Sequence, residues 1–150
     1  MAARTEQGTA LTALLADRWE QVSRKIERLA DILPEDEIEH ALVNGIRTYG
    51  AVLRHVAFWN QYVADCLNGK ATDDTSNELP FAQYSTKASA LAALRRSSAA
   101  VGAGLRGRKT SLDPKTTELI VTFLEHTSEH YGQLVVYSRL MGIVPLTSRG

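Results

Sequence analysis

Apolar residues recur every three or four positions along most of the chain, and this helical period constrains the fold more than any other feature of the sequence. The period predicts four amphipathic helices, at residues 10–33, 49–67, 86–106 and 114–141. No segment carries the alternation and turn residues of a β-hairpin. At 150 residues, the chain has the ordinary length of one domain. We therefore expect residues 1–150 to form a single all-α domain, a four-helix bundle.

Capping residues mark the starts of three of these helices. Thr48 is expected to cap the second helix and Ser85 the third, while Asp113 followed by Pro114 suits the start of the fourth. The longest connection, residues 69–83, is polar. Its length predicts a crossover between the second and third helices rather than a tight hairpin.

The charge balance argues against several classes of protein. Lys and Arg total 17 and so do Asp and Glu, so the formal net charge is zero, whereas nucleic-acid-binding proteins usually carry a basic excess. The single Cys cannot form an intramolecular disulfide. No segment approaches the roughly 20 apolar residues of a membrane span. We therefore expect a cytoplasmic protein with no nucleic-acid or membrane partner.

Three of the four histidines fall within predicted helices. His126 and His130 are four residues apart, so their side chains project from one face of the last helix about one turn apart. This arrangement suits two imidazole ligands of one metal ion, but the spacing alone is common in helices. His40 lies in an acidic connection, where a surface position is expected.

The third helical histidine, His55, lies in the middle of the second helix. The face that carries it also carries Trp59 and Tyr62 and is otherwise apolar, so it should point into the bundle. A buried imidazole needs a partner, because an unpaired buried polar group costs about 1–3 kcal/mol. A hydrogen bond within the core and a metal ion would each satisfy this requirement.

The face of the last helix around His126 is similar, because Gln133 and Tyr137 lie close to its direction. Three inward imidazoles from two helices would form a three-histidine metal site with an open coordination position, as in catalytic zinc sites. Separate structural roles for His55, His126 and His130 remain the alternative. Four further side chains are candidates for supporting the ligands or lining a pocket: Trp59, Tyr62, Gln133 and Tyr137.

These residues also carry a family resemblance. The segment 126–145 resembles the C-terminal signature of the DinB-like (damage-inducible) metal-binding bundle family, and segment 53–56 resembles the part of the second helix that holds that family's first histidine. The resemblance covers about residues 11–148. The matching residues of the signature are His126, His130, Gly132, Gln133, Tyr137, Arg139, Gly142 and Pro145.

The resemblance implies more than the spacing does. It implies a bundle in up-down-down-up order, with the long loop between the second and third helices as the crossover. It also implies that His55, His126 and His130 bind a divalent metal, commonly nickel or zinc, and that the protein forms a homodimer. Some members of the family are transferases or isomerases that use a small thiol, mycothiol or bacillithiol.

Three hypotheses for function follow. The first is a metal-dependent hydrolase or thiol transferase acting on a small molecule; no carboxylate is clearly placed as a general base, so its catalytic residues stay unassigned. The second is a non-catalytic metal-binding stress-response protein, with a fourth ligand from Glu129, Gln133 or a partner chain. The third is a metal-free helical interaction module.

Overall fold

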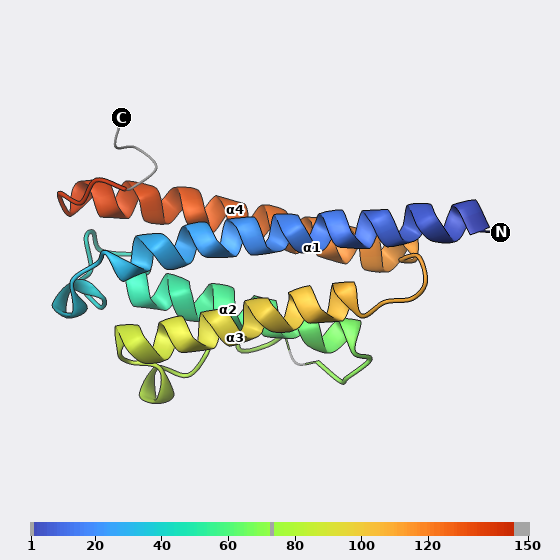
Figure 1. The fold of residues 1–150 in the computed structure, drawn as a ribbon. Coiled ribbons are helices and arrows are strands. Elements are labelled where there is room, and N and C mark those ends of the chain that lie inside the picture. Colours follow the sequence, from blue (N-terminus) through green and yellow to red (C-terminus); the bar gives the residue numbers. More distant parts are fainter. Residues whose placement is uncertain (1, 73, 146–150) are drawn as a thin grey trace.

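Four α-helices account for most of the chain (Figure 1). The computed structural model describes residues 2–72 and 74–145, and it contains no strand within them. Two short 3-10 turns, Glu35–Glu37 and Phe81–Gln83, lie in the connections. The all-α prediction is therefore confirmed. The helices are α1 (Ala2–Asp31), α2 (Tyr49–Leu67), α3 (Lys87–Arg106) and α4 (Pro114–Leu140).

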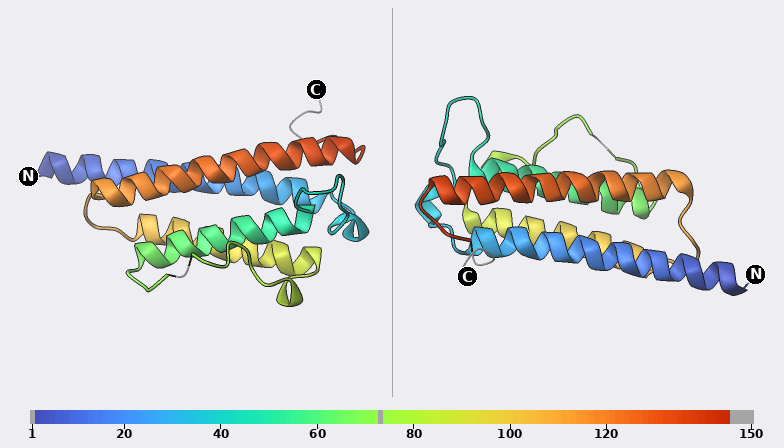
Figure 2. Two further views of the ribbon diagram at one scale, coloured as in Figure 1. Left: turned by 180° about the vertical axis from the view of Figure 1, so that it is seen from behind. Right: turned by 90° about the horizontal axis from the view of Figure 1, so that it is seen from above.

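The helices run in the predicted up-down-down-up order. α1 and α4 run in one direction while α2 and α3 run in the other, and the three views agree on this arrangement (Figures 1 and 2). α2 packs against α3 and α4, and α1 packs against the same two helices. Since α2 and α3 are parallel neighbours, segment 68–86 has to return along the bundle, and it is the predicted crossover.

The boundaries of α2 and α4 follow their caps. The side chains of Thr48 and Asp113 accept hydrogen bonds from the backbone N–H of the third residue of their helices, as expected for N-caps. The cap of α3 is Thr86 rather than Ser85. Thr86 and Ser89 each accept a backbone N–H from the other, and this capping box sets the start of the helix at Lys87.

The start of α1 also differs from the prediction, since the helix begins at Ala2 instead of residue 10. Residues 2–9 include good helix formers but no apolar stripe, so the periodicity gave no signal there. Gly8 permits a close approach to the α3–α4 connection, because a Cβ at this position would lie 2.6 Å from the Cβ of Ser111.

The core consists of two apolar clusters, one towards each end of the bundle, and each draws on all four helices. Ile26, Leu53, Leu94 and Leu134 belong to one cluster. The other includes Trp19, Val63, Val101 and Ile120. Along every helix, a buried polar residue lies between the residues of the two clusters: Ser23, Asn60, Ser97 and Thr127. The middle of the bundle is therefore polar, and His126 lies at this level of α4.

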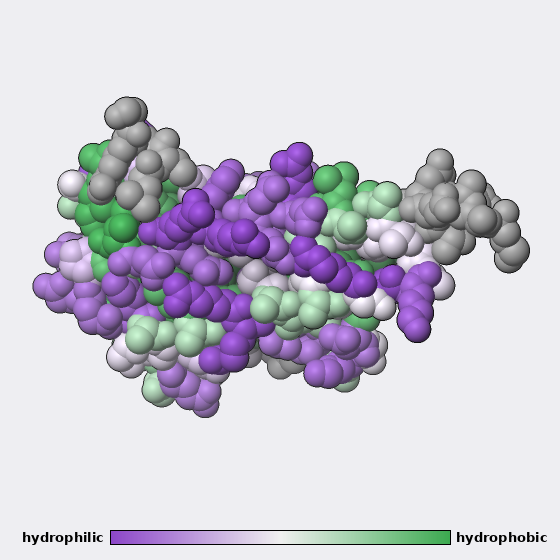
Figure 3. All heavy atoms as spheres, viewed as in Figure 1, coloured by the Kyte–Doolittle hydropathy of each residue, from purple (hydrophilic) through white to green (hydrophobic). Residues whose placement is uncertain are grey.

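Exposed ion pairs join α3 to α1 across a hydrophilic face (Figure 3). Arg95 pairs with Glu27 and Asp31, and Arg106 pairs with Asp17. Such solvent-exposed pairs contribute little to stability. Among the described helices, none combines the length and the apolar character that crossing a bilayer requires.

Candidate metal centre

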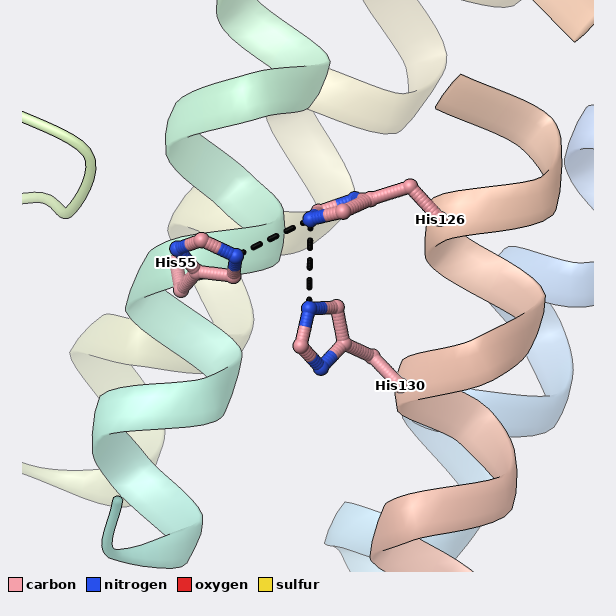
Figure 4. A group of neighbouring side chains, drawn as sticks. All are labelled: His55, His126 and His130. Atoms are coloured by element: carbon pink, nitrogen blue, oxygen red, sulfur yellow. Dashed lines mark hydrogen bonds between the residues drawn. The ribbon is translucent and has the colours of Figure 1, made fainter. Parts of the chain in front are cut away.

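Two facing helices bring the three predicted histidines together (Figure 4). His55 projects from α2, and His126 and His130 project from the neighbouring, antiparallel α4. His126 Nε2 lies 2.9 Å from His55 Nε2 and 3.1 Å from His130 Nε2. One nitrogen of each ring can be chosen so that all three lie within 4.8 Å of one another. The three histidines are thus positioned to bind one metal ion.

Hydrogen bonds on the outer side of two rings orient them. His55 Nδ1 lies 2.6 Å from the backbone carbonyl oxygen of Asn77, and His130 Nδ1 lies 2.7 Å from Gln133 Oε1. The amide of Gln133 in turn donates to the hydroxyl of Tyr137 at 2.7 Å, which leaves Oε1 as its acceptor. Because both partners are acceptors, each Nδ1 carries the proton and each Nε2 keeps its lone pair. Metal-ligating histidines typically have such outer partners.

This hydrogen-bonding pattern fits a metal ion better than it fits three histidines that satisfy one another by hydrogen bonds alone. The Nε2 lone pairs of His55 and His130 both point towards His126, and a single N–H of His126 can be donated to only one of them at a time. His126 Nδ1 is buried and has no hydrogen-bond partner among the described residues. A cation between the three rings would interact with all three nitrogens at once.

Two of the three histidines, His55 and His126, are held in the neutral form that metal binding requires. Burial lowers the pKa of His55 to about 4, and the hydrogen bond to Asn77 only partly opposes this effect. Burial also lowers the pKa of His126 to about 4, and the neighbouring His130, His55 and Arg47 add to the shift. At neutral pH these two rings are therefore unprotonated, so no proton has to leave them before a metal binds.

An aromatic group borders the histidines on one side. The ring centroid of Trp59 lies 6.4 Å from those of both His55 and His126. Phe123 stacks on Trp59 at 5.1 Å and lies 5.7 Å from His126. Tyr62 contacts Trp59 and Phe123, at 5.3 and 5.7 Å. Trp59 therefore lies beside the histidines, while Tyr62 lies one ring further out; a role in a pocket stays a prediction for both.

The described residues provide three ligands and no obvious fourth. No carboxylate or thiol of residues 2–72 and 74–145 joins the three histidines as a metal-ligating group. Glu129 is exposed, and Gln133 is already bonded to His130 and Tyr137. His40 is exposed on the α1–α2 connection, as predicted.

Sequence reasoning missed Asn77 and Arg54. Asn77 is exposed in the polar crossover, where no local pattern distinguishes it from its neighbours. Arg54 is a buried cation beside His55, and it pairs with Glu78 at 2.9 Å and with Glu39. The one sequence signal for its role is a charged residue on an otherwise buried helix face, because a buried charge needs a carboxylate partner from elsewhere in the chain.

Comparisons with known proteins bear on the family of the chain. The family model of the DinB superfamily matches residues 18–134, which include all three histidines. No curated protein matches the chain.

Proposed function

The chain belongs to the DinB superfamily, and from this premise we propose that it binds a divalent metal ion, zinc or nickel, through Nε2 of His55, His126 and His130. The convergence of the three nitrogens carries the proposal. The acceptors on Nδ1 of His55 and His130 support it, because they leave those Nε2 lone pairs free for a ligand bond.

The proposal extends to a metal-dependent enzyme that acts on a small molecule, a hydrolase or a thiol transferase. Three protein ligands leave coordination positions open, as in catalytic rather than structural sites. A divalent ion bound there would lower the pKa of a coordinated water or small thiol, such as mycothiol or bacillithiol, and so supply a nucleophile. No described carboxylate joins the histidines as a ligand, so no carboxylate general base is assigned in this proposal.

The surrounding side chains would shape the ligand position. Trp59 and Phe123 present aromatic surface next to His126, which excludes water on that side and favours a ligand with an apolar part. Gln133 and Tyr137 hold His130 from the other side of its ring. In this proposal the protein positions the metal and the substrate, and no protein residue is assigned a proton-transfer role.

Metal titration tests the binding proposal. Untagged protein is made metal-free and titrated with zinc and then nickel in a calorimeter. We expect one ion per chain, a loss of binding in His126→Ala, and unchanged binding in His40→Ala, since His40 lies outside the cluster. Wild-type protein that takes up no ion, or His126→Ala that binds as well as wild type, contradicts the proposal.

A second experiment separates an open site from the closed site of a non-catalytic metal-binding protein. Cobalt-loaded protein is titrated with a small thiol while its visible and near-ultraviolet spectrum is recorded. A new thiolate-to-cobalt absorption is expected if coordination positions are open, and a panel of thiols and electrophilic substrates then follows. An unchanged spectrum contradicts the enzyme proposal and favours a fourth ligand, for example from the homodimer that the resemblance implies and that stays a prediction.

A further inference from the structure

The crossover between α2 and α3 touches the metal centre at Asn77. We propose that Asn77 is a positioning residue for His55: its backbone carbonyl holds the proton on Nδ1 and thereby aims the Nε2 lone pair at His126, in the cluster that also contains His130. The inference rests on the proposed function in one respect, namely that His55 Nε2 is a metal ligand.

The contact is short, and it joins a buried side chain of α2 to the backbone of the crossover. The distance from His55 Nδ1 to the carbonyl oxygen of Asn77 is 2.6 Å, although the two residues are 22 positions apart. His55 is 5% exposed, so its Nδ1 has little access to water that could replace this acceptor. If the carbonyl moved away, the proton could shift to Nε2, where it would block the metal.

The backbone at Asn77 is specialised for this contact. Its φ of 57° lies in the left-handed region, and it is the only non-glycine residue with a positive φ among those described. Asn tolerates this conformation better than most residues do. A residue confined to negative φ would turn the local chain differently, and the carbonyl could not keep both its position and its direction.

A second hydrogen bond fixes Asn77 to the same helix face. The side-chain Oδ1 of Asn77 accepts a hydrogen bond from Trp59 Nε1 at 2.9 Å. Trp59 follows His55 by one helical turn, so Asn77 is held to α2 at two adjacent turns. One residue thus contacts both a proposed ligand and the aromatic side chain beside it.

Arg54, the residue before His55, anchors the chain that follows Asn77. Its guanidinium pairs with Glu78 at 2.9 Å and donates to the carbonyl of Tyr84 at 3.2 Å. Its backbone carbonyl also accepts from the N–H of Leu79 at 3.4 Å. These contacts fix segment 77–84 against α2, so the carbonyl of Asn77 is part of a docked segment.

Two substitutions separate the carbonyl contact from the side-chain contact. Asn77→Gly and Asn77→Pro both remove the hydrogen bond to Trp59, but only glycine readily keeps a positive φ. We expect Asn77→Gly to bind zinc nearly as tightly as wild type. We expect Asn77→Pro to bind about 10- to 100-fold more weakly, the usual loss when an outer partner of a metal-ligating histidine is removed. Asn77→Ala, which disfavours the left-handed region without losing an N–H, should fall between them.

The tautomer of His55 gives a readout that needs no metal. Long-range ¹H–¹⁵N NMR of metal-free protein should show the proton on Nδ1 of His55 in wild type and in Asn77→Gly. It should show a loss of this preference in Asn77→Pro, with His130 unchanged as the internal reference. A general loss of structure would alter both histidines, and Asn77→Ala then serves as the milder test.

Two results would overturn the inference. One is Asn77→Pro or Asn77→Ala with the wild-type tautomer and wild-type zinc affinity. The other is an equal loss in Asn77→Gly and Asn77→Pro, which would assign the effect to the Trp59 contact. Wild-type protein that binds no metal overturns the proposed function instead, and the tautomer comparison still decides the role of Asn77.

Discussion

The two helices that form the candidate metal centre hold their histidines in different ways. On α4, His130 is oriented by Gln133, which lies three residues further along the same helix. On α2, His55 is oriented by Asn77, which lies 22 residues away in the crossover. The α4 half of the site is therefore built by helical periodicity alone, whereas the α2 half depends on the docking of a loop.

The two halves also differ in burial. His55 is buried on α2 beside the equally buried Arg54, while His126 and His130 are only half-buried. The α2 half is therefore coupled to the stability of the fold, and the α4 half is closer to solvent. Substitutions should separate these properties: changes near α2 should affect stability together with metal binding, and changes on α4 should affect mainly metal binding.

The largest expected effect comes from the residue that joins the two halves. His126 Nε2 is the nitrogen that lies close to both of the others, at 2.9 and 3.1 Å. We expect His126→Ala to weaken zinc binding by more than 100-fold, which is about 3 kcal/mol. Calorimetric titration of His126→Ala and of His40→Ala checks this result. A smaller loss in His126→Ala than in His130→Ala would show that the ion lies elsewhere.

The second prediction concerns the loop-dependent half. Arg54→Met removes a cation whose side chain is 4% exposed and leaves Glu39 and Glu78, about 30% exposed, to be hydrated. We expect a loss of about 2 kcal/mol in the free energy of unfolding, between the values for buried and exposed ion pairs. Zinc affinity should fall as well, because segment 77–84 loses its anchor.

Arg95→Met is the matched control for Arg54→Met, since Arg95 pairs with two carboxylates on an exposed face. It should cost less than about 1 kcal/mol and leave zinc affinity unchanged. Urea unfolding of both variants measures the difference. Equal losses in the two proteins would contradict the distinction between the two regions.

The third prediction isolates the local half. Gln133→Leu removes the acceptor of His130 Nδ1, so zinc affinity should fall by about 10-fold, the lower end of the usual range for such partners. Gln133→Glu keeps an acceptor and should bind nearly as well as wild type. In both variants the NMR tautomer of His55 should stay unchanged. A change at His55 would show that the two halves are coupled directly.

The last prediction concerns the response of the metal-free protein to pH. The pKa of His55 and His126 is lowered from 6.5 to about 4 in the folded chain, so the unfolded chain binds more protons between these values. The contribution of these two histidines to stability should therefore be constant above pH 7 and fall from about pH 6.5 towards pH 4. The slope should stay below about 1 kcal/mol per pH unit for each histidine, because solvent reaches part of the site.

Chemical denaturation across this pH range measures the slope, and a His55→Leu, His126→Leu double variant should lack these two contributions. The double variant provides the comparison that separates the histidines from other acid-sensitive groups. A wild-type slope equal to that of the double variant would contradict the lowered pKa values.

The sequence predicted the local features of this protein better than the long-range ones. α2 has the predicted bounds because Thr48 caps it, and the spacing of His126, His130 and Gln133 placed these residues on one face. The cap of α3 is Thr86 and not the predicted Ser85, because Thr86 has Ser89 three residues later to complete a capping box, whereas Ser85 has Ala88 there. The long-range features depend on tertiary structure, which periodicity does not describe.

Asn77 shows this limit most clearly. Its backbone conformation and its contact with His55 arise only when the crossover docks on α2, and the neighbouring residues in the sequence indicate neither. The sequence leaves two roles open for His55, a ligand of a shared metal ion and a hydrogen-bonded residue of the core. An apolar helix face accommodates either one.

X-ray absorption spectroscopy of the protein loaded with one equivalent of zinc tests the metal centre most directly. We predict three imidazole nitrogens at about 2.0–2.1 Å from the ion, together with an oxygen donor that a small thiol replaces with sulfur. The same measurement on His55→Ala should show two imidazoles. A wild-type spectrum with fewer than three imidazoles, or one that His55→Ala leaves unchanged, would contradict a metal site shared between α2 and α4.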